Sequence, residues 1–157
     1  MLKPLPLTLA ALCAAALLWG CSDPSPVEQV AGSYTCKTTE YSRYQTPAGV
    51  WRDTALVYKD DATVSVSAVD DNTAKVTIVS RQFGTAEFAS VEVKDYGYVA
   101  NLSGQGSIKK EYEVNAHGAS LSGSVTYENR NIALSASVPD RGSRYTLSFT
   151  NANYTEL

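Results

Sequence analysis

The chain has 157 residues, with 13 basic and 16 acidic side chains and a formal net charge of −3. This length is typical of one domain. The slightly acidic balance argues against a nucleic-acid partner, because phosphate backbones select strongly basic surfaces. No segment after residue 20 is apolar enough to predict a membrane-spanning helix.

The N-terminus has the pattern of a secretory signal. Lys3 precedes an apolar run over 7–18 that is too short to span a bilayer comfortably. Leu18-Trp19-Gly20-Cys21 then resembles the lipobox of bacterial lipoproteins, in which the cysteine is lipidated and becomes the mature N-terminus. We therefore expect residues 1–20 to be a signal peptide and the lipid on Cys21 to hold the protein on a membrane.

The segment after the lipidation site contains two prolines and several polar residues. This composition predicts a short flexible tether, so that 21–29 is the lipidated cysteine with its tether and 30–157 is the folded domain. Ser22 follows the cysteine where the enterobacterial sorting rule uses Asp for retention, which favours the outer membrane. The periplasmic and surface faces both remain open.

Cysteine usage leaves one thiol in the folded domain. Cys13 is removed with the signal and Cys21 carries lipid, so Cys36 has no partner for an intramolecular disulfide. A buried thiol behaves as a small hydrophobe, and this is the state we expect for Cys36. A reactive or dimer-forming cysteine is the alternative.

From Val30 onward apolar and polar residues alternate with a period of two, which is typical of strands with one buried face. The first strand is predicted over 30–37 and the second over 51–59, on either side of a turn at 46–49. Cleaner alternation predicts seven further strands, over 62–69, 74–80, 88–94, 98–108, 119–127, 132–138 and 144–150.

Short turn signals join these strands, which predicts an all-β, up-and-down antiparallel meander. A sheet of about eight or nine strands tends to close into a barrel, because closure removes the exposed edges. A two-sheet β-sandwich is the runner-up, since it would show the same alternation.

Several motifs resemble those of the calycin-like, or lipocalin-like, lipoproteins common in Bacteroidetes. They lie at 31–35, 102–108, 121–125 with 131–135, and 144–150. The resemblance implies a calycin-type barrel of eight strands. It also implies that Gly32-Ser33-Tyr34 takes the place of the calycin Gly-x-Trp signature on the first strand, and that Arg144 is the basic residue from the last strand that packs against it.

No catalytic constellation is visible. His117 is the single histidine, no Gly-x-Ser-x-Gly elbow is present, and no Cys/His cluster has the spacing of a zinc site. The pairs Asp60-Asp61 and Asp70-Asp71 fall at predicted turns, where adjacent carboxylates point to opposite faces. We therefore expect a protein that is not an enzyme and has no cofactor and no metal.

The candidate binding residues are apolar and aromatic. Small residues on the inward-facing positions would leave room for an apolar or amphipathic ligand, unless Tyr and Phe side chains fill it. The leading hypothesis is a membrane-anchored barrel that binds such a ligand as a monomer. The alternative is a solid barrel whose loops bind a protein or a glycan, or act as an inhibitor. The residues expected at the interior or the mouth are Tyr41, Tyr44, Trp51, Tyr98, Leu102, Leu121 and Leu134.

Overall fold

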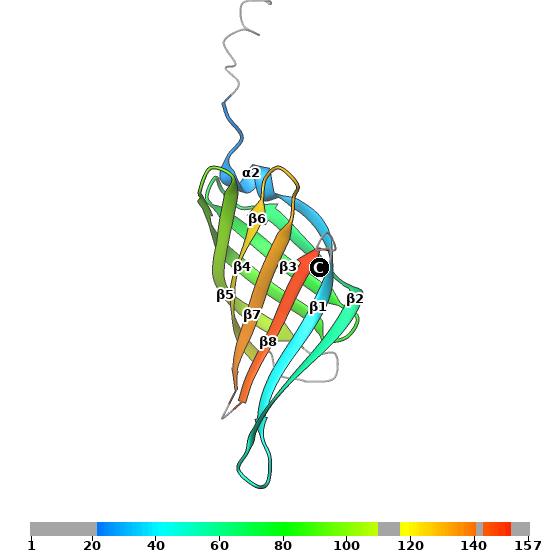
Figure 1. Ribbon diagram of the computed structural model, residues 1–157. Coiled ribbons are helices and arrows are strands. Elements are labelled where there is room, and N and C mark those ends of the chain that lie inside the picture. Colours follow the sequence, from blue (N-terminus) through cyan, green and yellow to red (C-terminus); the bar gives the residue numbers. More distant parts are fainter. Residues whose placement is uncertain (1–21, 110–116, 141–142, 152–157) are drawn as a thin grey trace, which may run out of the picture.

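The computed structural model describes residues 22–109, 117–140 and 143–151 (Figure 1). The strands form one closed antiparallel barrel in which every strand pairs with its neighbours in sequence. The predicted up-and-down barrel of eight strands is confirmed, and the sandwich is wrong. The elements are α2 (Pro26–Val30), β1 (Gly32–Gln45), β2 (Trp51–Ala68), β3 (Thr73–Ser80), β4 (Gly84–Asp95), β5 (Val99–Lys109), β6 (His117–Thr126), β7 (Ile132–Asp140) and β8 (Ser143–Asn151).

Strands β1 and β2 are longer than the sequence pattern predicts. The segments expected as two strands, 51–59 and 62–69, form the single strand β2. A bulge joins them, where Lys59, Asp60 and Asp61 lie opposite Lys37 alone. Asp60 has a positive φ of 46° there. The turn expected at Asp60-Asp61 is therefore wrong, because a bulge takes up the extra residues without ending the strand.

The barrel interior holds the apolar half of the alternation. A second bulge, between Glu87 and Ser90, changes which residues of β4 face inward. Phe88 is therefore buried and Ala89 is exposed, although the sequence pattern placed Ala89 inside. The largest fully buried side chains include Phe88, Phe149, Ile78, Leu102, Ile108, Leu121, Ile132, Leu134 and Leu147.

The outer wall is polar. Its exposed strand positions are mainly hydroxyl, amide and charged side chains, among them Thr63, Ser65, Lys75, Glu92, Asn101, Ser103, Ser120 and Ser122. Such a wall is hydrated, with the apolar side chains turned inward. Among the described residues, no helix is long and apolar enough to cross a membrane.

The segment expected as a tether contains a short helix. Ser25 caps α2 in a capping box with Glu28, and Pro26 occupies the start of the helix. Val27 and Val30 are fully buried and belong to the core. Helix α2 contacts β2 and β4 and lies across one end of the barrel (Figure 1). The flexible tether to residue 29 is therefore wrong for 26–29, because two valines on one face of the helix bury against the barrel.

Candidate functional site

The β1–β2 hairpin projects beyond the other strands at the end of the barrel opposite α2 (Figure 1). Among the described residues, strand β1 pairs with β8 over Cys36–Arg43 alone, and β2 pairs with β3 over Ala62–Ala68 alone. The β2 section Trp51–Lys59 therefore has β1 as its only strand neighbour among the described residues. A two-stranded ribbon of this kind exposes both faces.

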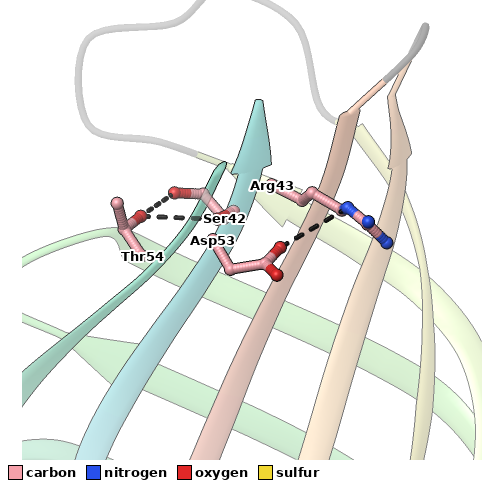
Figure 2. A network of polar contacts seen from close by, with 4 residues as sticks. All are labelled: Ser42, Arg43, Asp53 and Thr54. Carbon is pink, nitrogen blue, oxygen red and sulfur yellow. Dashed lines mark hydrogen bonds and ion pairs between the residues drawn. The ribbon is translucent and has the colours of Figure 1, made fainter. Parts of the chain in front are cut away.

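The outer face of the hairpin carries an ion pair and an aromatic contact. Arg43 Nε lies 3.5 Å from Asp53 Oδ1, and the Arg43 guanidinium carbon lies 5.4 Å from the centroid of the Trp51 ring. Figure 2 shows Arg43 and Asp53 pointing to one side of the ribbon. Both are well exposed, so we assign the pair little stability and regard it as a surface feature of the hairpin.

The opposite face of the hairpin carries hydroxyl groups. The hydroxyls of Ser42 and Thr54 lie 2.6 Å apart, on the other side of the ribbon from Asp53 (Figure 2). The tip is held by backbone bonds, since Thr46 N–H donates to Val50 O at 2.9 Å and Gly49 N–H to Thr46 O at 2.8 Å. The predicted turn at 46–49 is confirmed, and the hydrogen bonds give the tip a defined shape.

The structure separates the predicted binding residues into three places. Tyr41, Tyr44 and Trp51 come together on the hairpin, where they are 48%, 48% and 45% exposed. Tyr41 and Trp51 share the outer face, while Tyr44 belongs to the opposite face because its register partner is Arg52. Tyr98 is 74% exposed and precedes β5 at the α2 end of the barrel. The sequence pattern of 98–108 placed Tyr98 on the inward face, but β5 begins at Val99 and Tyr98 belongs to the turn before it.

The three predicted leucines lie in the core on adjacent strands. Leu102 on β5 and Leu134 on β7 both lie opposite Gly123 on β6. Leu121 lies on β6, two residues before Gly123. All three are at most 2% exposed. They face the barrel interior as expected, but they pack against other side chains there.

The inward-facing glycines do not leave free space. A Cβ at Gly104 would lie 2.9 Å from Ser90 O and 3.1 Å from a Val91 methyl, and a Cβ at Gly106 would lie 2.5 Å from the Phe88 ring. At Gly123 it would lie 2.8 Å from Leu134 Cδ2. The expected room over these glycines is therefore occupied by Phe88, Val91 and Leu134. Glycine serves here to let neighbouring side chains approach the backbone.

A buried carboxylate lies near the hairpin end of the interior. Asp61 is 6% exposed, and its Oδ2 accepts hydrogen bonds from Thr38 Oγ1 at 2.8 Å and from the Ser80 hydroxyl. Ser80 Oγ also accepts the N–H groups of Gln82 and Phe83. This network ties the β2 bulge to the β3–β4 turn. No cluster of metal-ligating side chains occurs in the described part of the chain.

At the α2 end, Arg130 joins the β6–β7 turn to the first strand. Its guanidinium carbon lies 5.0 Å from the Tyr34 ring centroid, and its nitrogens donate to Gln29 O, Ala31 O and Tyr34 Oη at 3.1, 2.8 and 2.9 Å. Burial raises the pKa of Tyr34, and the neighbouring guanidinium opposes that rise. Arg130 thus ties α2 and β1 to the β6–β7 turn.

The basic residue expected in this place was Arg144, and that expectation is wrong. Arg144 pairs in register with Arg43, near the hairpin end of β1, whereas Tyr34 lies near the α2 end of the same strand. The sequence offered no signal for Arg130, because its contact with Tyr34 joins segments far apart in the chain.

A further feature absent from the sequence analysis is an open groove of about 480 Å³ on the outer wall over β4, β5 and β6. It is lined mainly by polar side chains, among them Glu92, Lys94, Asn101, Ser103 and Ser122. The groove is part of the hydrated wall.

Comparison with known proteins supports the fold. No protein-family model matches the chain, and no curated protein matches it in sequence. Its fold is similar to a solved structure from Bacteroides fragilis that is described as "a putative outer membrane protein", with a TM-score of 0.56 and 16% identity. The match covers 84% of this chain and 54% of that one, so this chain spans about half of its neighbour. At this identity the likeness shows the barrel fold alone.

Proposed function

We propose that the protein is a lipid-anchored, calycin-like envelope protein in which the barrel is a filled scaffold and the β1–β2 hairpin binds a protein partner. One observation carries the proposal. Of the five exposed aromatic side chains in the described part of the chain, Tyr41, Tyr44 and Trp51 lie on one projecting ribbon, where Tyr41 and Trp51 share one face; the other two, Tyr96 and Tyr98, lie in the β4–β5 turn. Tyr and Trp are enriched where one surface recognises another, because large rigid rings lose little entropy on binding.

The anchoring part of the proposal rests on the signal pattern and Cys21. Its support is the polar outer wall, because serine, threonine and charged side chains are costly against lipid hydrocarbon. The lipid would then be what attaches the protein to the membrane. The neighbour from Bacteroides fragilis is described as "a putative outer membrane protein", which agrees with a place in the envelope.

The anchor would also orient the barrel. Cys21 and Pro26 are separated by a chain that reaches roughly 17 Å when fully extended. The α2 end would therefore stay close to the membrane surface. The hairpin lies at the other end of the barrel and would point away from the lipid, toward partners (Figure 1).

The calycin-like assignment is supported by the contact of Arg130 with Tyr34. The resemblance implied a basic side chain from the last strand packed on Gly32-Ser33-Tyr34, whereas the basic side chain found there comes from the β6–β7 turn. Here Arg130 lies over the Tyr34 ring, and a Cβ at Gly32 would lie 2.6 Å from Arg130 Nη2. The glycine therefore leaves the space that the guanidinium occupies.

The filled interior favours the binding module over the ligand carrier. A carrier needs an apolar cavity, and the positions expected to provide one are occupied by Phe88, Val91 and Leu134. Phe83 also packs against Phe149 near the hairpin end, with ring centroids 5.6 Å apart. These contacts make the interior a packed core in this region.

The test compares two exposed tyrosines. A photoreactive phenylalanine analogue replaces Tyr41 in one variant and Tyr98 in the other, in cells that make the protein. Tyr98 is the matched control because it is more exposed and lies at the α2 end. We expect a protein adduct from position 41 and none from position 98.

Equal adducts from both positions, or none from 41, would contradict the module. The carrier would replace it if the purified protein bound a fluorescent apolar probe and Ala100→Phe abolished that binding with the melting temperature unchanged. Ala100 is fully buried and faces the interior, so this variant fills any internal site directly.

A further inference from the structure

The hairpin has a free edge as well as two exposed faces. Over Trp51–Lys59, β2 pairs with β1 on one side, and no described residue pairs with its other side. Alternate N–H and C=O groups on that side therefore point outward without a strand partner. An edge of this kind is a template for another strand.

The order of charges along this edge is self-complementary. The sequence runs Arg-Asp at 52–53, then Thr-Ala-Leu-Val-Tyr, then Lys-Asp at 59–60. If a second copy lies antiparallel about a two-fold axis at Leu56, Asp53 falls opposite the partner's Lys59 and Arg52 opposite the partner's Asp60. Asp53 and Lys59 then each face an opposite charge, and the apolar middle faces itself. Arg52 faces the partner's Asp60, which lies in the β2 bulge just beyond this section.

We propose that two copies of this chain join edge to edge through Trp51–Lys59, centred on Leu56. The contact is isologous, so each pair occurs twice. Directly opposite residues in an antiparallel pair have Cβ atoms about 4.5–5.5 Å apart, within reach of ion pairing. Leu56 and Val57 are 53% and 57% exposed in the single chain. Leu56 would meet its own copy, and Val57 would meet the partner's Ala55.

The ion pair already present on the hairpin fits this arrangement. Asp53 lies 3.5 Å from Arg43 on the β1 side, and the partner's Lys59 would approach it from the free side. The carboxylate would then lie between two cations in a ladder that crosses the joined sheet. A register shifted by one residue on the partner strand, with the axis between two residues, places Asp53 opposite the partner's Tyr58 and loses both charge pairs. Charged side chains on a strand edge usually oppose pairing with another strand. Here they would favour pairing in one register, because that register, unlike the shifted one, places opposite charges across from one another.

This dimer departs from the monomer expected from the sequence, and it does not depend on the proposed function. The dimer uses the edge of β2, whereas the partner surface uses the outer face with Tyr41. A negative result for the dimer therefore does not contradict the partner-binding hairpin, and the reverse also holds. The mass of a photo-adduct at position 41 shows whether the cross-linked molecule is a second copy of this chain or a different protein.

The experiment measures the oligomeric state of residues 22–157, which contain every described element of the barrel. Sedimentation velocity over a concentration series should show a monomer–dimer equilibrium for the wild type. Asp53→Lys and Lys59→Asp each place like charges opposite one another, and each alone should be monomeric. Circular dichroism confirms that both variants keep the strand signal.

Two further samples make the test specific. An equimolar mixture of Asp53→Lys and Lys59→Asp should form a heterodimer, because each charge then meets its opposite across the interface. The double variant Asp53→Lys/Lys59→Asp should again dimerise with itself. Arg43→Ser is the matched control, since it removes the ion pair within one chain and should leave the dimer in place. A monomeric wild type, or a dimer that both single reversals leave intact, would overturn the proposal.

Discussion

Arg130 and Tyr34 form the contact that closes the α2 end of the barrel. The guanidinium lies over the ring at 5.0 Å and donates to the phenol oxygen at 2.9 Å, while Tyr34 Oη in turn donates to Val30 O at 2.5 Å. The contact links the β6–β7 turn, β1 and α2 in one network. It makes the placement of α2 depend on a side chain about a hundred residues further along the chain.

Replacing Arg130 should therefore cost more than replacing an ordinary surface arginine. Arg130→Ala removes donors to Gln29 O, Ala31 O and Tyr34 Oη. Two of these bonds are exposed, so we expect a total loss of about 1.5–3 kcal/mol, the contribution of one good hydrogen bond from a charged group. Arg130 has a positive φ of 53°. Alanine is strained to a similar degree in that conformation, so backbone strain does not contribute to the difference in stability between the wild type and Arg130→Ala. Urea denaturation of residues 22–157 gives the loss.

Arg43→Ala is the matched control for this variant. Arg43 also lies over an aromatic ring and pairs with a carboxylate, but on the exposed hairpin, where such pairs contribute about 0–1 kcal/mol. Equal losses from the two variants would show that Arg130 has no special role in closing the barrel.

The packing over the inward-facing glycines gives a second prediction. Gly106→Ala would drive a methyl group into the Phe88 ring, 2.5 Å away, and into the Glu87 carbonyl. Overpacking of this kind costs about 1–3 kcal/mol. Gly118→Ala on the neighbouring strand meets nothing within 4 Å and should leave the melting temperature nearly unchanged. If Gly106→Ala were as stable as the wild type, the interior would contain free space, and the ligand-carrier hypothesis would be favoured again.

The barrel could be predicted because its signal is local. Strands from β3 to β8 alternate in the sequence with a period of two, and six of the nine expected strand segments correspond to single strands of the structure. The bulge at Asp60 could not be read this way, because adjacent aspartates are typical of a turn. Helix α2 does have a local signal, since Ser25-Pro26-Val27-Glu28 has the pattern of a capping box with proline at the first helical position.

The site was less predictable than the fold because it depends on long-range contacts. The turn at 46–49 was predicted, and the structure places Tyr41, Tyr44 and Trp51 on the two strands that flank it, with Tyr44 on the opposite face from the other two. The choice between Arg130 and Arg144 as the partner of Tyr34 depends on which end of the barrel each turn occupies. Whether alanines and glycines leave a cavity depends on neighbours such as Phe88, whose inward direction follows from a bulge that periodicity does not show.

Lipid attachment is tested by one substitution in the full-length chain. Cys21→Ser removes the thiol that would carry the acyl chains, so the protein should move to the soluble fraction or accumulate as an uncleaved precursor. Two or more chains hold a protein far more firmly than one, so the wild type should pellet with membranes even after a salt wash. Cys13→Ser, within the signal, is the control and should behave as the wild type. A processed Cys21→Ser protein that stays on the membrane would contradict the anchor.

The last prediction concerns Cys36, which is fully buried on β1 beside the core. Burial raises the pKa of this thiol from 9.0 to about 12, because an apolar environment disfavours the thiolate. Well below pH 9 the thiol is mostly neutral in both the folded and the unfolded chain. Above pH 9 the unfolded chain loses its proton first, so the free energy of unfolding should fall as the pH rises from 9 toward 12.

Urea denaturation of residues 22–157 across this pH range measures the effect against Cys36→Ala, which lacks the titrating group and should lose stability less steeply. Thiol labelling at pH 8 gives an independent readout, because the thiolate is the reactive form. Native wild type should label slowly and unfolded protein quickly. Thr35→Cys in the Cys36→Ala background is the control, since position 35 is exposed and its thiol should label while the barrel is folded. Parallel stability curves for wild type and Cys36→Ala, with rapid labelling of native Cys36, would show instead that the thiol is open to solvent and available for reaction.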